Sequence, residues 1–222
     1  MAYGVDAPFG LQPRSYLNGN VWTGQVTEYF INGNISGGAT SYATSLYMGD
    51  LVKLDVQGVV VKAAVGDASI GVFWGCKYFD TTNTLVFSKN WTASTPTFNN
   101  TNPICYVVDD PNVLFSAQVK GTGNVTGNIN TINIGVNANA TYQSELNYNY
   151  NIHFGASTGG STISGNSTSY VDLATQNTTA TLQVKLIQLE KYPGNNFGTV
   201  FNNGLFLINN HIYKGGTGTA GV

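Results

Sequence analysis

Breaks in helical patterning constrain this fold more than any other feature of the sequence. No window longer than about ten residues combines 3.6-residue apolar spacing with freedom from Gly, Pro and clusters of β-branched residues. Turn signals recur instead between short apolar runs, as they do in proteins built from many short strands. We therefore predict an all-β protein, an antiparallel β-sandwich or barrel.

Two segments show strand patterning most clearly. Apolar and polar residues alternate through residues 131–142, with the period of two expected of a half-buried strand. Alternation also runs through residues 182–186, but Ile187 and Leu189 then fall on the opposite parity. A β-bulge would absorb this slip, and a strand buried on both faces would also explain it. The sequence leaves these two alternatives open.

Hairpin turns are predicted where Gly or Asn lies between apolar flanks. Asn32-Gly33, Gly58 and Gly204 all occupy such positions, and both residue types tolerate the positive φ of a tight turn. The segment YFDTTNTLVF predicts a hairpin with a longer polar loop. These turns would connect antiparallel neighbours in a sheet.

The same pattern divides the chain into three parts. Residues 1–25 are predicted to form an extended N-terminal arm, and residues 26–214 a β domain. Within that domain, residues 121–179 are a candidate elaboration or insertion. Residues 215–222 form a Gly-rich C-terminal tail.

The predicted arm carries apolar and aromatic side chains on a path that proline stiffens. Pro8 and Pro13 fix φ and lack a backbone donor, so the segment should run extended over a surface. That surface could belong to its own domain or to a neighbouring subunit, and the sequence leaves both open. The candidate neighbour-binding residues are Pro8, Phe9, Leu11, Pro13, Arg14, Tyr16 and Trp22.

Charge is sparse. Charged residues make up 9% of the chain, against roughly 25% in an ordinary soluble domain. Lys and Arg are isolated and the net charge is -2, so we expect no nucleic-acid partner. No run of about 18 apolar residues predicts a membrane span. The first residues lack a basic and then apolar signal pattern, which favours synthesis in the cytoplasm.

The residues most capable of chemistry are not arranged in a recognisable catalytic pattern. Ser157 lies in a G-x-S-x-G match, but the surrounding segment 155–169 is Ser/Gly-rich and cannot supply the helix that a nucleophile elbow needs. His153 and His211 lack an acidic partner at a recognisable spacing, which favours structural roles. We predict that His211 is a strand residue.

Adjacent carboxylates are explained better by turns than by catalysis. Asp109 and Asp110 would point to opposite faces of a strand, and Asp before Pro is typical of a strand-ending turn. Gly66-Asp67 and Gly49-Asp50 have the same interpretation.

The chain has two cysteines, far apart in sequence. Cys76 and Cys105 match no metal-binding spacing, so we predict two buried thiols, with a disulfide as the alternative. We assign no catalytic residue, metal ligand or cofactor.

Four segments, in order along the chain, resemble a group of tailed-bacteriophage virion structural proteins: APFGLQPRSYLNG, MGDLVKLDVQGVVVKAAVGDASIGVFWGCKYFD, YVVDDPNVLFSAQV and LFLINNHIYKGGTGTAGV. The second segment is also similar to capsid decoration (cement) proteins. Together the segments cover about a third of the chain, and the last is the most specific.

This resemblance implies a non-enzymatic protein on the capsid exterior of a virion, made in the host cytoplasm. It would bind the major capsid protein and itself, as a trimer in preference to a dimer, and stabilise the capsid by bridging subunits. It implies neither a nucleic-acid nor a membrane partner. The alternative is a tail-associated receptor- or glycan-binding protein, which the Tyr- and Asn-rich segment ATYQSELNYNYNIHF suggests.

Overall fold

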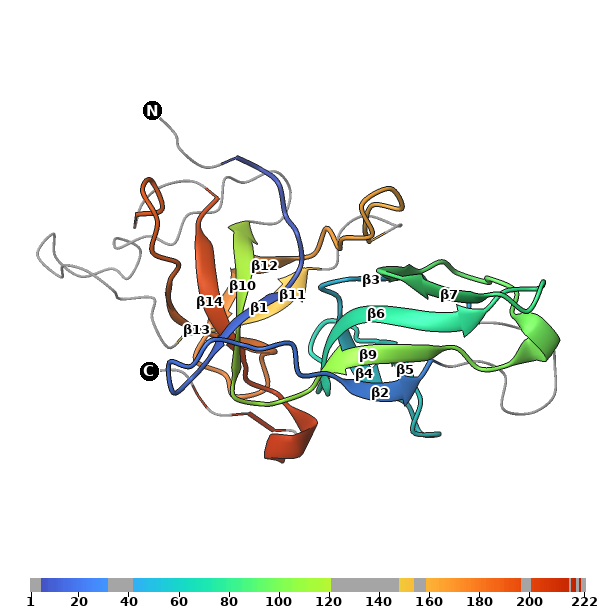
Figure 1. The fold of residues 1–222 in the computed structure, drawn as a ribbon. Coiled ribbons are helices and arrows are strands. Elements are labelled where there is room, and N and C mark those ends of the chain that lie inside the picture. Colours follow the sequence, from blue (N-terminus) through green and yellow to red (C-terminus); the bar gives the residue numbers. More distant parts are fainter. Residues whose placement is uncertain are drawn as a thin grey trace, which may run out of the picture.

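The computed structural model describes residues 5–31, 42–120, 148–153, 159–196, 201–215, 217–218 and 220. Regular structure in these ranges is β, apart from two single 3-10 turns, η1 (Phe98–Asn100) and η2 (Ile212–Lys214). The predicted all-β class is confirmed. The strands form two lobes that lie side by side in Figure 1.

The first lobe, here called the barrel lobe, is a closed five-stranded barrel. Its strands follow the order β10 (Val113–Lys120), β12 (Tyr170–Asn177), β11 (Asn149–His153), β13 (Val184–Leu189) and β14 (Asn203–Ile208). The barrel closes because β14 pairs back with β10. The pairing of β10 with β12 is parallel and the other pairings are antiparallel.

The second lobe, here called the sheet lobe, holds the order β2 (Thr27–Phe30), β9 (Ile104–Val108), β6 (Gly71–Phe79), β4 (Leu51–Leu54) and β5 (Val60–Lys62). Strand β7 (Leu85–Ser88) pairs with the C-terminal half of β6. Strands β3 (Leu46–Tyr47) and β8 (Asn90–Trp91) form a separate pair. A single bridge from Ile31 to Val60 links the two ends of the main sheet.

Each lobe has its own hydrophobic core, and the barrel core extends into the sheet lobe. In the barrel, the rings of Tyr150 and Phe206 meet edge to face with centroids 6.1 Å apart. Leu51, Val72 and Val108 come from the sheet lobe but pack in the barrel cluster. Burial of each such side chain contributes roughly 1.5–3 kcal/mol to folding. The lobes are therefore packed against each other through shared apolar contacts.

Two predicted hairpins are confirmed. Gly58 lies in the turn between β4 and β5 with φ +75°, and its N–H donates to the Asp55 carbonyl. The polar loop between β6 and β7 is held by Asp80, whose Oδ1 accepts from the backbone N–H groups of Thr82 and Thr84. The Asn32-Gly33 turn and the alternation in 131–142 lie outside the described residues.

The prediction for Gly204 is wrong. Gly204 lies inside β14, where a Cβ would come within 2.7 Å of the Phe206 side chain. Glycine is needed there for close packing, and the positive φ falls earlier, at Phe201. The parity slip at Ile187 is a β-bulge. Leu186 pairs with Phe206 and Gln188 pairs with Leu205, so Ile187 is the extra residue on β13.

The described part of residues 121–179, the candidate elaboration or insertion, belongs to the barrel. Strands β11 and β12 lie within this range and complete the barrel between β10 and β13. Val171 of β12 is fully buried in the core. Polar residues flanking these short strands hide them in the sequence, while pairing with neighbours on both sides fixes them in the fold.

The N-terminal segment is part of the barrel lobe rather than a separate arm. Its strand β1 (Gln12–Tyr16) pairs with the start of β10, beside the point where β12 joins the same strand. Within the tail 215–222, residues 216, 219, 221 and 222 lie outside the described residues.

Candidate functional site

The residues predicted to bind a neighbour do not gather on one exposed surface. Leu11 is 1% exposed and belongs to the barrel core, and Pro13 is buried in β1. Pro8 and Phe9 are half-buried. Of the two surfaces that the sequence left open for this segment, Leu11 and Pro13 therefore pack on their own chain. An edge strand accepts proline because no partner needs its missing donor.

Arg14 and Trp22 also have partners within the chain. Arg14 Nε lies 3.1 Å from Glu190 Oε1, in an exposed ion pair worth about 0–1 kcal/mol. The Trp22 ring packs edge-on against Trp74, with centroids 5.1 Å apart. These contacts attach the segment to both lobes. A role in binding a neighbour stays a prediction for the exposed parts of Arg14 and Tyr16.

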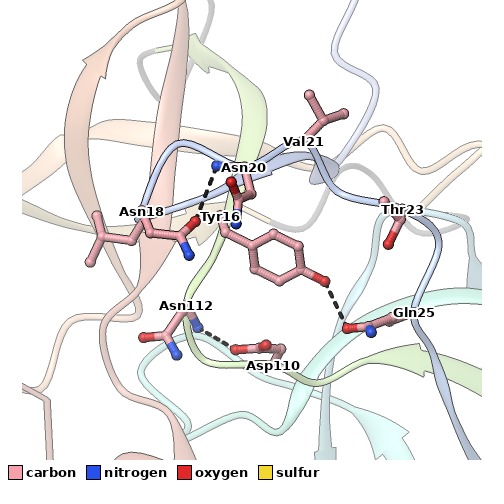
Figure 2. Close-up of a pocket in the computed structure, with 9 residues that line it drawn as sticks. Tyr16, Asn18, Asn20, Val21, Thr23, Gln25, Asp110 and Asn112 are labelled. Carbon is pink, nitrogen blue, oxygen red and sulfur yellow. Dashed lines mark hydrogen bonds between the residues drawn. The ribbon is translucent and has the colours of Figure 1, made fainter.

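Tyr16 lines an open pocket of about 790 Å³ (Figure 2). Its hydroxyl hydrogen-bonds Gln25 Oε1 at 2.8 Å, and the Asn112 N–H donates to Asp110 Oδ1 at 2.8 Å. The second contact confirms the turn predicted at Asp110. The lining is made of Tyr16, Leu17, Asn18, Asn20, Val21, Thr23, Gln25, Asp110 and Asn112. Amides, one phenol and the Asp110 carboxylate can hydrogen-bond a neutral polar ligand, and the lining offers no cation for an anion.

A buried carboxylate lies where the lobes meet. Asp50 is fully buried, and its Oδ1 accepts from Ser167 Oγ at 2.5 Å and Ser169 Oγ at 3.2 Å. Its Oδ2 accepts from the Tyr47 N–H and lies 2.9 Å from Lys62 Nζ. The sequence predicted only a turn at Asp50. The turn is present, and the four donors compensate a charge that would otherwise be costly to bury.

The backbone around Asp50 is as closely packed as its side chain. The Gly10 N–H donates to the Ser169 carbonyl, and the Leu11 N–H donates to the Gly49 carbonyl at 2.9 Å. Gly10 and Gly49 have φ of +73° and +99°. A Cβ on Gly10 would lie 2.7 Å from both the Gly49 oxygen and Ser167 Cβ. Three distant segments thus meet here with no space for another atom.

A second contact between the lobes surrounds His211. The Ser69 N–H donates to the Asn210 carbonyl, and the Ile212 N–H donates back to the Ser69 carbonyl. His211 is fully buried between them, and its Nδ1 accepts from the Tyr213 N–H at 3.1 Å. Burial lowers the pKa of His211 to about 4, so the ring is neutral at physiological pH. It is a structural residue in a β-bridge.

The connection from β9 to β10 also crosses between the lobes. Asp109 accepts from Thr27 Oγ1 at 2.9 Å and from the Tyr29 hydroxyl at 2.7 Å. Tyr29 also hydrogen-bonds the Tyr213 hydroxyl at 2.8 Å. We define the lobe junction as Gly10, Leu11, Gly49, Asp50, Lys62, Ser69, Asp109, Ser167, Ser169 and His211.

The lobe junction draws on all four segments that carry the resemblance noted above. Gly10 comes from the first segment, Asp50 from the second, Asp109 from the third and His211 from the fourth. These motifs, which lie far apart in sequence, therefore meet in space. What they have in common is a structural task, holding the two lobes together.

The sheet lobe carries a second surface of interest, on the side of the sheet away from its core. One row of paired residues crosses β2, β9, β6 and β7: Phe30 pairs with Ile104, Ile104 with Lys77, and Lys77 with Phe87. Because directly paired residues share a face, their side chains leave the sheet on the same side. Phe30 is 53% exposed and Phe87 67% exposed.

The neighbouring rows add more apolar surface and one ion pair. Phe79 and Leu85 pair with each other and are 43% and 45% exposed. Lys77 Nζ lies 2.6 Å from Glu28 Oε1 and 5.4 Å from the centre of the Tyr106 ring. We call this surface the outer face; it comprises Glu28, Phe30, Lys77, Phe79, Leu85, Phe87, Ile104 and Tyr106.

The opposite side of the same sheet carries the thiols. Cys76 and Cys105 pair across β6 and β9, and both are buried and free, as predicted. Burial raises the pKa of Cys76 to about 12 and raises that of Cys105 further. Both thiols are therefore protonated and inert in the folded protein.

Within the described ranges, no group of three or more His, Cys, Asp or Glu side chains is placed to hold a metal ion. No helix in that part of the chain is long and apolar enough to cross a membrane. Comparison of the chain with protein-family models, curated proteins and solved structures found no match.

Proposed function

We propose that this protein is a non-enzymatic structural component of a tailed-phage virion. It binds the outside of the phage head and stabilises the capsid by bridging subunits of the major capsid protein. The observation that carries the proposal is the lobe junction, which joins two β lobes into one body. A bridging protein needs separate contact surfaces held at a fixed spacing, and a rigid pair of lobes supplies them.

The junction resists hinge motion for a physical reason. Any separation of the lobes would remove the hydroxyls of Ser167 and Ser169 from the Asp50 carboxylate. Breaking a buried charged network in this way costs about 3–5 kcal/mol. A body that is rigid before binding loses less conformational entropy on binding, so more of the contact energy stabilises the shell. Mass action then favours the capsid state that the protein binds.

The proposed protein lies on the shell in many copies that contact one another, which its low charge permits. With a net charge of -2, many copies can lie close together with little repulsion. Copies related by a closed symmetry reuse one patch, and we favour a trimer at local three-fold positions over a dimer. The resemblance of the four segments to virion proteins supports this arrangement.

Copy number in purified virions tests the proposal. Quantitative gel analysis of the phage that encodes this chain should give hundreds of copies per particle. A dozen or fewer copies would place the protein in the tail or at the portal and would reject head decoration. Pelleting of the added protein with heads that lack it provides an independent binding assay.

A second candidate function rests on the pocket beside Tyr16. Its amides and phenol can hydrogen-bond and stack on a neutral sugar, as a receptor- or glycan-binding tail protein requires. Tyr16→Ala should abolish binding on a glycan array, whereas Tyr192→Ala, at an exposed site outside the pocket lining, should not. Absence of any glycan binding by the intact protein would reject this candidate.

A further inference from the structure

The outer face is the largest set of strand-borne apolar side chains that the described residues leave uncovered. Phe30, Phe79, Leu85 and Phe87 expose between 43% and 67% of their surface. They come from β2, β6 and β7 and point away from the core of the sheet lobe. Contiguous exposed apolar surface on a folded protein commonly marks an interaction site.

We propose that the outer face is a contact between two copies of this chain, packed face to face across a two-fold axis. The inference rests on the self-association in the proposed function and names its surface. A two-fold contact can join two trimers as readily as two monomers, so it adds to a three-fold arrangement on the shell.

The exposed area matches what a stable pair requires. Aromatic side chains present about 150–250 Å² each, so the four exposed fractions amount to about 400 Å² of apolar surface per copy. Two copies would bury about 800 Å². Since interfaces are roughly 60% apolar, the whole contact would reach about 1,300 Å², within the standard range of 1,200–2,000 Å².

The charges of the outer face favour a second copy over a charged partner. Among its eight residues, only Lys77 and Glu28 are charged, and their ion pair leaves the face neutral. The Glu28 side chain remains 51% exposed. A two-fold axis that runs between Lys77 and Glu28 sets Lys77 of one copy near Glu28 of the other, so every charge at such a contact finds an opposite. A strongly acidic or basic partner would leave one of these charges opposed by a like charge.

The sheet geometry of the outer face suits a face-to-face contact. Four neighbouring strands carry the side chains in register, so the surface is an ordinary sheet face rather than a groove. Two such faces can pack about 10 Å apart with interdigitated side chains, as in a β-sandwich.

The first test uses the full-length protein in solution. Because the proposed three-fold positions lie on the shell, we expect the free wild type to sediment as a dimer at micromolar concentration, and Phe87→Glu to weaken association at least 100-fold. Val56→Glu is the matched control, because Val56 is fully exposed in the β4–β5 turn, outside the outer face. A monomeric wild type would overturn the inference, and so would a dimer unaffected by Phe87→Glu or equally weakened by Val56→Glu.

A charge-complementation experiment tests the intermolecular pairing itself. Lys77→Glu and Glu28→Lys each place like charges across the two-fold axis, so each variant alone should associate at least tenfold more weakly than the wild type. An equimolar mixture should recover heterodimers, although the ion pair within each chain remains broken. No recovery in the mixture would contradict the paired arrangement.

The outcomes separate this inference from the proposed function. If Phe87→Glu abolishes pelleting with phage heads while the wild type is monomeric, the outer face binds the shell and the inference fails. If the dimer forms as described but virions hold few copies, head decoration fails and the two-fold contact remains.

Discussion

The two lobes use their apolar residues differently. In the barrel lobe, strands β10 to β14 contribute no large exposed apolar side chain, and Phe115, Tyr150 and Phe206 all lie inside. In the sheet lobe, the inner side is equally buried, but Phe30 and Phe87 lie on the outside. The strands of both lobes have an outward side, but among the described strands only those of the sheet lobe carry large exposed apolar side chains there.

Removal of the Asp50 carboxylate from the lobe junction should change stability the most. Asp50→Ala should lower the free energy of unfolding by about 3–5 kcal/mol, because Lys62 and two serine hydroxyls lose their buried partner. Asp80→Ala is the control in an exposed turn and should cost about 1 kcal/mol or less. Urea denaturation measures both. A loss of under 1 kcal/mol for Asp50→Ala would contradict the junction's importance.

The N-terminal segment offers the next largest effect. Leu11→Ala should cost about 2–5 kcal/mol, because the side chain fills the barrel core. Val5→Ala removes a side chain that is 73% exposed and should change stability little. Thermal and urea unfolding of the two variants would compare them. Equal, small effects would mean that residues 5–11 do not belong to the barrel.

Two glycines with positive φ test how closely the backbone is packed at the lobe junction. Gly10 and Gly19 both have positive φ, but only Gly10 is surrounded by atoms that a Cβ would strike. Gly19→Ala should cost about 1 kcal/mol from backbone strain alone. Gly10→Ala should cost about 1–3 kcal/mol more, since Gly49 and Ser167 must move. Equal losses in denaturant would show that the approach at Gly10 is loose.

Acid should weaken the junction through His211. The pKa of this residue is about 4 in the folded protein and about 6.5 when unfolded, so the unfolded chain binds more protons between these values. The stability that the neutral His211 contributes is fully present above pH 6.5. The free energy of unfolding falls by up to about 1.4 kcal/mol per pH unit as the pH drops toward 4. His211→Asn should flatten this part of the stability curve. An unchanged slope would place the titration elsewhere.

Local patterns in the sequence predicted much of the fold. The all-β class, the turn at Gly58 and the polar loop at Asp80 each depend on residues within one hairpin or strand, and so does the bulge at Ile187, which was one of two alternatives. Short-range turn chemistry and alternation determine such features. The barrel closure depends instead on the pairing of β10 with β14. These strands lie far apart in sequence, so no local pattern predicts that they are neighbours.

The candidate surfaces were harder to predict, for a similar reason. Asp50 looked like a turn residue because its donors Ser167 and Ser169 lie more than 100 residues away. Nothing in the sequence distinguishes Phe87 from a buried strand residue. Its pairing with Lys77 and its 67% exposure show that it faces outward. Alternation predicts that a strand has two faces, but the tertiary fold decides which face is covered.

Native-state hydrogen exchange in low urea tests most directly whether the junction makes one body of the two lobes. Buried amides of β6 and β9 report on the sheet lobe, and those of β10 and β14 report on the barrel lobe. We predict a common free energy of opening for both sets in the wild type, and separate values in Asp50→Ala. Values that differ by about 2 kcal/mol or more in the wild type would show that the lobes open independently, and would contradict the rigid bridge.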